Sequence, residues 1–164
     1  MSYLLWTVIG VPFAGAAVLA IFGARMPKWM AGAIGCASVG ISAVAAAIVS
    51  VAYLSANPET PFGSILYRWL DIGGLRVEMG LHLDALSLVM MAVVTFVSFL
   101  IHLYAAQSMY EEDGYSRFFA YMNLFVGAML VLVLADNLLL LFLGWEGVGL
   151  CSYLLIGFWY RDTA

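Results

Sequence analysis

The chain has 164 residues, of which 65% are hydrophobic and 10% are charged, and its formal net charge at pH 7 is −4. Soluble globular domains average about 45–50% apolar and about 25% charged residues, so this composition excludes an ordinary soluble domain. Six basic residues against ten acidic ones leave no basic surface for a nucleic acid.

Five apolar runs are each long enough to cross a bilayer as a helix, which takes about 20 residues. The first run contains Pro12, which a membrane-spanning helix tolerates. The N-terminus lacks both a basic segment and a small-residue cleavage site, so we expect the first run to be a retained span. The predicted spans cover approximately residues 3–24, 30–54, 84–105, 118–135 and 138–160.

A polar segment separates the second span from the third. It starts with the loop sequence SANPETP and continues with two short runs, ILYRWLDI and LRVEMGLHL, around Gly73-Gly74. Rough alternation on both sides of a Gly-Gly pair indicates a β-hairpin, and a sheet edge cannot face lipid. The sequence therefore predicts an all-α polytopic membrane protein with about five transmembrane helices, in residues 1–54 and 83–164, and an extramembrane β-hairpin in residues 55–82.

The basic residues favour one orientation. With the N-terminus outside, four of the six basic residues fall inside, and only Arg68 and Arg76 fall outside. Cytoplasmic loops usually carry the excess of Lys and Arg. We therefore expect the N-terminus and the hairpin outside, and the C-terminus in the cytoplasm.

Several polar residues in or near the spans have structural interpretations. Asp84 is predicted to cap the third span, and Asp136 the fifth, because a short acidic side chain satisfies free backbone N–H groups at a helix start. Asn123 is predicted to form an interhelical hydrogen bond. Cys36 and Cys151 lie in apolar runs without a CxxC or Cys/His partner, which indicates small buried side chains and no zinc site.

Glu146 is the strongest functional candidate. It lies about eight residues into the fifth span, or about 12 Å along the helix axis, which is near the middle of the bilayer. A charge at that depth costs several kcal/mol, so the side chain should face protein or a wet cavity. Burial favours the neutral acid and a nearby cation favours the carboxylate, so a balanced carboxyl can exchange a proton near neutral pH. The alternative is a protonated acid that only hydrogen-bonds a neighbouring helix.

Small residues flank Glu146 on two helix faces. Gly144, Gly147 and Cys151 form one stripe, whereas Gly149 and Tyr153 follow Glu146 on the other side. Glycines usually indicate close helix packing. On the Glu146 side they would also leave room for water, and the Tyr153 hydroxyl could extend a hydrogen-bonded path.

His102, near the inner end of the third span, is a weaker candidate. Its ring can change charge near neutral pH. A histidine in such a place is more often an interfacial residue with a satisfied hydrogen bond, and we favour that interpretation.

The segment YSRFFAYMNLFVGAMLVLVLADNLLLLFLGWEGVGLCSYLLIGFWY, residues 115–160, closely resembles the antiporter-like subunit L of respiratory complex I, the NADH:quinone oxidoreductase, which is chain 5 in mitochondria. The upstream LHLDALSLVM and FLIHLYA also resemble that family. Cation/proton antiporter subunits share the Trp-Glu pair but usually differ just after it, and they rank second.

The resemblance implies a role in proton transport. In this family the antiporter-like subunits move protons. The glutamate of the family's Trp-Glu-Gly segment, residues 145–147 here and called the WEG segment below, lies on the charged axis of the membrane arm, so that role carries over onto Glu146. NADH oxidation and quinone reduction occur in other subunits. We therefore expect no cofactor in this chain, with NADH, FMN, iron–sulfur clusters and quinone in partner subunits. The expected partners are other membrane-arm subunits and the lipid bilayer, and the expected location is a bacterial inner membrane.

The sequence departs from the family in its extent. The family pairs this glutamate with a lysine on a later broken helix and has an aspartate on the next helix, and the sequence ends before both. It matches the opening portion of the family chain, well under half, so a further part of that chain or a second chain should supply the partners. Three hypotheses follow: a proton-translocating segment, a non-conducting scaffold of the membrane arm, or a segment of a multisubunit cation/proton antiporter.

Overall fold

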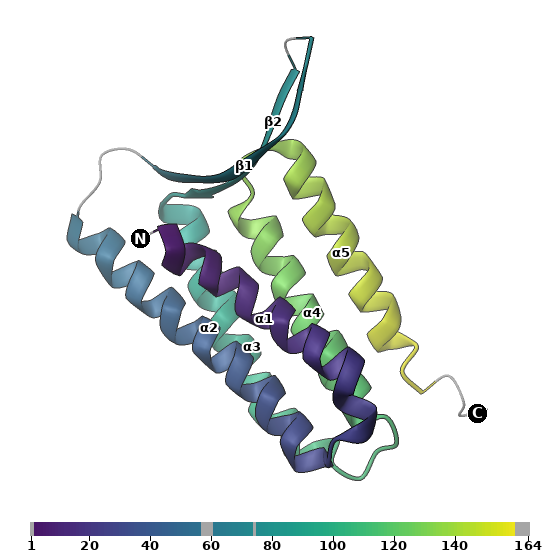
Figure 1. The fold of residues 1–164 in the computed structure, drawn as a ribbon. Helices are drawn as coiled ribbons and strands as arrows, with labels where there is room; N and C mark the ends of the chain where they lie inside the picture. Colours follow the sequence, from purple (N-terminus) through teal and green to yellow (C-terminus); the bar gives the residue numbers. More distant parts are fainter. Residues whose placement is uncertain (1, 57–60, 74, 160–164) are drawn as a thin grey trace.

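Five helices stand side by side, and a two-stranded hairpin projects from one end of them (Figure 1). The computed structural model describes residues 2–56, 61–73 and 75–159. Within that part, five helices are long and apolar enough to cross a membrane, so the prediction of a multi-pass helical membrane protein is confirmed. The helices are α1 (Ser2–Phe22), α2 (Lys28–Ala56), α3 (Ala85–Ser108), α4 (Tyr115–Leu134) and α5 (Leu138–Ile156), and a short 3-10 turn, Gly23–Arg25, follows α1.

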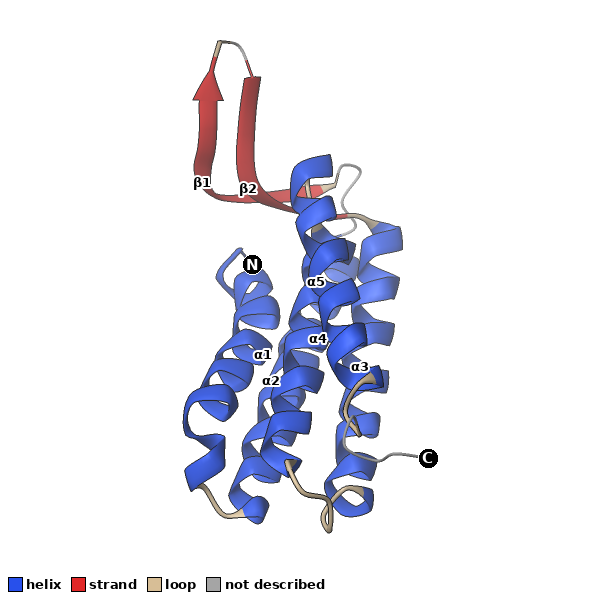
Figure 2. Cartoon of the chain, turned by 90° about the vertical axis from the view of Figure 1, so that its right-hand side faces the viewer, coloured by secondary structure: helices blue, strands red, loops and turns tan. Residues whose placement is uncertain are grey.

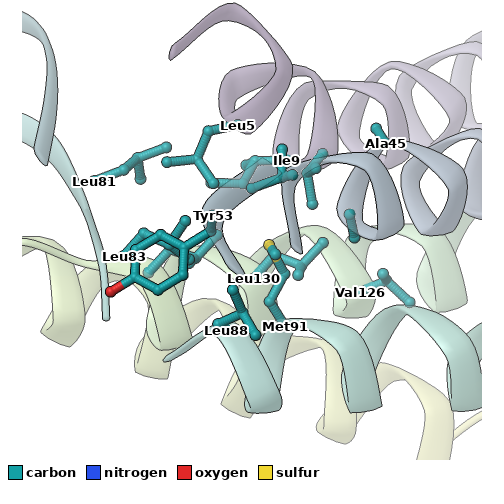
Figure 3. Close-up of a cluster of buried hydrophobic side chains, with 14 of the residues drawn as sticks. Leu5, Ile9, Ala45, Tyr53, Leu81, Leu83, Leu88, Met91, Val126 and Leu130 are labelled. Atoms are coloured by element: carbon teal, nitrogen blue, oxygen red, sulfur yellow. The ribbon is translucent and has the colours of Figure 1, made fainter. Parts of the chain in front are cut away.

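Helix α4 is the centre of the bundle. It packs against α1, α2, α3 and α5, whereas α5 lies at the outer edge (Figures 1 and 2). Two groups of buried apolar side chains fill the bundle. One group, near the hairpin, includes Leu5, Leu83, Met91 and Leu130 (Figure 3), and the other, near the opposite end, surrounds Phe119.

The hairpin consists of β1 (Phe62–Ile72) and β2 (Leu75–Leu83), which pair antiparallel. Gly73 adopts a positive φ of 58° in the turn, a conformation that favours glycine. At the base of the hairpin, Leu81 and Leu83 are buried in the bundle core. The predicted hairpin is therefore confirmed, and its base is part of the folded bundle.

The start of α3 is capped as predicted. Asp84 Oδ1 accepts a hydrogen bond of 2.7 Å from the Ser87 backbone N–H. In return, the Asp84 backbone N–H donates to Ser87 Oγ at 2.8 Å. Each side chain thus satisfies a backbone donor that the first helical turn leaves without a partner.

The predicted cap of α5 was wrong by one residue. Asn137 is the N-cap, and its Oδ1 accepts a hydrogen bond of 3.0 Å from the Leu140 N–H. Asp136 instead belongs to the preceding turn, where its backbone N–H donates to the Gly80 carbonyl on β2 at 3.2 Å. This contact with the hairpin holds Asp136 in the turn, so the cap falls on the next residue, and α5 starts at Leu138 as predicted. The helix also ends at Ile156, earlier than the predicted residue 160, which itself lies outside the described residues.

Candidate functional site

One face of α5 packs closely against α4. Gly144 and Cys151 are buried on that face. A Cβ at Gly144 would lie 2.6 Å from the Leu132 backbone nitrogen, and a Cβ at Gly147 would lie 3.0 Å from Ala128 Cβ. The small-residue stripe therefore lets the two helices approach each other, as small residues do between membrane helices.

Glu146 lies on the opposite, uncovered face of α5. Gly149 and Tyr153 are exposed on the same side, and Tyr153 is 74% exposed. A Cβ at Gly149 would have no atom within 4 Å. Within the described residues, no hydrogen bond or ion pair involves the Glu146 carboxyl group. The predicted division of the glycines between two helix faces thus agrees with the structure.

The surroundings of Glu146 are apolar. Leu143, Trp145 and Leu150 are each more than half exposed on α5. A helix that is apolar on its outer side can face lipid or another helix, but a carboxylate at this depth is unfavourable in hydrocarbon. Glu146 is therefore an acidic residue on an exposed helix face, and its carboxyl group needs a protein or hydrated neighbour.

His102 belongs to a different polar cluster, inside the bundle. Its side chain is fully buried, with Nδ1 2.8 Å from the Ser98 carbonyl and Nε2 3.4 Å from Asn123 Nδ2. An amide nitrogen only donates, so Nε2 accepts and Nδ1 carries the hydrogen of a neutral ring. The prediction of a satisfied hydrogen bond is confirmed, whereas the interfacial location was wrong.

Asn123 connects this cluster to other helices. Its Oδ1 accepts a hydrogen bond from the Ser38 hydroxyl group on α2, and its Nδ2 donates to the Phe119 carbonyl at 2.9 Å. The predicted interhelical hydrogen bond of Asn123 is therefore confirmed. The cluster joins α2, α3 and α4, and no described contact joins it to Glu146.

Nothing in the sequence pattern singles out His82, which the structure places between two carboxylates. Its ring lies near Asp84 and Asp136, which are far apart in the sequence. Only the return of the chain from α4 to the hairpin brings Asp136 beside His82 and Asp84. Among the described residues, no group of three His, Cys, Asp or Glu side chains is arranged to hold a metal ion.

The fold and the site together define a class, namely multi-pass helical membrane proteins with an acidic residue in the middle of one helix, α5, and a two-stranded hairpin between α2 and α3. Two family models match the sequence. The one described as NADH-ubiquinone oxidoreductase (complex I), chain 5 N-terminus, matches residues 69–119. The one described as NADH:quinone oxidoreductase/Mrp antiporter, TM, matches residues 135–164.

Curated relatives agree with these matches. NADH-quinone oxidoreductase subunit L of Escherichia coli is 50% identical over 162 residues, which are 99% of this chain and 26% of that protein. Subunit L of Pseudomonas aeruginosa is 49% identical over 152 residues, which are 92% of this chain and 25% of that protein. Subunit L of Mycobacterium tuberculosis is 41% identical over 160 residues.

The chain belongs to the family of antiporter-like subunit L of NADH-quinone oxidoreductase, and it matches the N-terminal part of that family. It spans about a quarter of the length of these curated relatives. The resemblance expected from the WEG segment is thereby confirmed.

Proposed function

We propose that this chain is the N-terminal segment of a proton-translocating membrane-arm subunit of NADH:quinone oxidoreductase, with Glu146 as a proton-exchanging residue. The observation that supports this proposal most directly is the position of Glu146. It lies at mid-helix, on the face of α5 that is turned away from α4. A carboxyl group placed there needs a protein or hydrated neighbour, and such a neighbour can hold or remove its proton.

The remaining parts of the proposal follow from the family. Other membrane-arm subunits and the lipid bilayer are the partners, and a further protein segment supplies the basic residue opposite Glu146. NADH, FMN, iron–sulfur clusters and quinone bind elsewhere in the assembly. Tyr153 extends the polar path along the same face of α5. His102 supports the bundle through its hydrogen bonds and does not exchange protons with Glu146.

A cation/proton antiporter segment is the second candidate, because the family model that matches residues 135–164 also covers Mrp antiporters. Sodium-dependent proton exchange in vesicles without NADH and quinone would favour it. In the scaffold alternative, Glu146 serves only as a hydrogen-bonding group between helices.

The substitution Glu146→Gln tests the proposal, because glutamine keeps the size and hydrogen bonding of the side chain but cannot exchange a proton. In the assembled complex in sealed vesicles, we expect the rate of NADH-driven proton translocation to fall at least about tenfold, since single acid–base groups contribute about 10²–10⁴-fold to proton-transfer rates. Glu111→Gln is the matched control, because Glu111 is an exposed acid in the loop between α3 and α4. Normal assembly of Glu146→Gln with an unchanged rate of proton translocation and an unchanged ratio of protons to electrons would contradict the proposal and support the scaffold alternative.

A further inference from the structure

The 3-10 turn after α1 meets the start of α4 at the end of the bundle opposite the hairpin (Figure 1). A cavity of about 370 Å³ lies there, within the range of about 300–1,000 Å³ that ligand pockets usually have. Its lining includes Gly23 from the 3-10 turn, Lys28 from the start of α2, and Ser116 and Arg117 from α4. Segments that are far apart in the sequence therefore surround one cavity.

Close packing holds the lining of this cavity in place. A Cβ at Gly23 would lie 2.8 Å from Ser116 Cβ, so the glycine lets the 3-10 turn approach α4. Tyr115 is buried, and its hydroxyl group donates a hydrogen bond of 3.0 Å to the Ala106 carbonyl on α3. The start of α4 is thus fixed against both α3 and the 3-10 turn.

Two basic side chains line the cavity, and both are partly buried. Lys28 Nζ donates a hydrogen bond of 2.9 Å to the Tyr110 carbonyl. An ammonium group has three N–H donors, so this bond uses only one of them. The guanidinium carbon of Arg117 lies 5.2 Å from the centre of the Phe158 ring, which fixes the direction of that side chain. Both positive charges are therefore held at the cavity.

Among the described residues that line the cavity, none is acidic. Glu111, Glu112 and Asp113 are close in sequence, in the α3–α4 loop, but they do not line it. Glu112 contacts the end of α5 instead, where its Oε2 accepts a hydrogen bond of 3.0 Å from Trp159 Nε1. The cavity thus presents two positive charges and a serine hydroxyl group, a combination of donors that fits a phosphate group.

The apolar surroundings indicate that this phosphate group belongs to a lipid. Ile21 and Phe22, which directly precede Gly23, are 65% and 50% exposed. Trp29, next to Lys28, is also exposed, and tryptophan is typical of the interface between membrane and water. A lipid with its phosphate group in the cavity would have its acyl chains beside the exposed end of α1. Basic pockets between membrane helices are a recognised kind of site for anionic lipid head groups.

We propose that this cavity binds the phosphate group of an anionic phospholipid through Lys28, Arg117 and the Ser116 hydroxyl group. A zwitterionic head group would bring its own ammonium group toward the same two cations, so the site favours a lipid with a net negative charge. The bound lipid connects the end of α1 with the starts of α2 and α4. This inference holds whether or not Glu146 exchanges protons.

Photo-cross-linking of the purified native membrane assembly, reconstituted in phosphatidylcholine vesicles, tests the proposal. The probe is a trace of phosphatidylglycerol with a photoreactive group near the start of one acyl chain. We expect cross-links in residues 21–29 and 114–121, which excess phosphatidylglycerol suppresses and inorganic phosphate at the same concentration does not. Lys28→Gln and Arg117→Gln should each lower this cross-linking about fivefold, the usual contribution of one basic residue to the binding of an anionic lipid.

Arg25→Gln is the matched control, because Arg25 is an exposed basic residue of the 3-10 turn that does not line the cavity. It should lower the cross-linking less than about twofold, since salt screens exposed charges. Equal losses in Arg25→Gln and Lys28→Gln would show a general attraction of this surface for anionic lipids and would overturn the proposal. Suppression by inorganic phosphate as strong as that by phosphatidylglycerol would also overturn it, because the ligand would then be a soluble phosphate.

The natural sequence gives a decisive result even if a variant fails to assemble. Cross-links in the two segments that phosphatidylglycerol suppresses, and further phosphatidylcholine does not, support the proposal. Equal suppression by both lipids, or cross-links spread evenly over the outer helix faces, would contradict it. Lys28→Arg keeps the positive charge and should keep the cross-linking of the natural sequence.

Discussion

Asp84 shows how much a single residue at a helix start contributes to this fold. The hydrogen bonds from the Ser87 backbone N–H and then from the Ser87 hydroxyl group lower the pKa of the Asp84 carboxyl group, and nearby His82 adds to this effect. A carboxyl group with a lower pKa in the folded chain stabilises the fold above its ordinary pKa, and this stabilisation is lost as the pH falls through the folded value.

We therefore expect Asp84→Ala to lower the free energy of unfolding by about 1 kcal/mol at pH 7, the usual cost of removing an N-cap. The difference from the natural sequence should shrink below about pH 4, where aspartate becomes protonated. Asp84→Asn should retain most of the stability, because asparagine also caps helices. Detergent-induced unfolding of the purified protein at pH 7 and pH 3.5 measures these effects.

Asp113→Ala is the control, since Asp113 is exposed in the loop between α3 and α4. A loss in Asp84→Ala that is the same at both pH values would contradict the role of the ionised cap. An Asp84→Asn variant as unstable as Asp84→Ala would do so too.

At the scale of elements, α5 has two faces that differ in their neighbours. The Gly144 face approaches the α4 backbone so closely that a methyl group has no space, whereas the Gly149 face has open space in the described structure. Both residues are glycines in the same helix, so alanine substitutions at the two positions differ mainly in the space that surrounds the added methyl group. Gly144 and Gly149 are therefore a matched pair for testing how α5 packs on α4.

We expect Gly144→Ala to destabilise the packing of α5 on α4 by about 1–3 kcal/mol, the usual cost of overpacking. Gly149→Ala should be neutral or stabilising by up to about 1 kcal/mol, because alanine favours helix. The stability of each purified variant against denaturing detergent gives the comparison. A Gly144→Ala variant as stable as Gly149→Ala would mean that α5 does not pack on α4 through this stripe.

At the scale of the whole molecule, the hairpin and the α3–α4 loop lie at opposite ends of the helices (Figure 1). The bundle is long enough to span a bilayer, since 20 helical residues extend about 30 Å. The two ends should therefore meet water on opposite sides of the membrane. In the predicted topology, four of the six basic residues lie on the side opposite the hairpin, and this excess predicts that the hairpin is on the outer side of the membrane.

Cysteines at Ile72 and Glu111, both exposed, test this arrangement. In intact bacterial cells, a membrane-impermeant maleimide should label Ile72→Cys and leave Glu111→Cys unlabelled, and inverted vesicles should give the reverse. The natural sequence, in which Cys36 and Cys151 lie within apolar helices, provides the background. Labelling of both variants from one side would contradict the five-span topology, and the reverse pattern would invert the orientation.

The sequence by itself determined the class of protein, the five spans, the hairpin, the cap at Asp84 and the two faces of α5. These features depend on hydrophobic length, on alternation around glycines, and on spacing along one helix, which are all local properties of the chain. The WEG segment also marked Glu146 and the family without any structure. The cap of α5 was misplaced by one residue, because a backbone contact with a strand more than fifty residues away holds Asp136 in the preceding turn.

Only the tertiary structure decided which polar groups meet. His102 and Asn123 lie on different helices, and their pairing depends on how α3 and α4 pack together. Asp136 lies beside His82 and Asp84 because α4 returns the chain to the base of the hairpin. Contacts between distant segments depend on the balance of packing over the whole bundle, and no local pattern of residues specifies that balance.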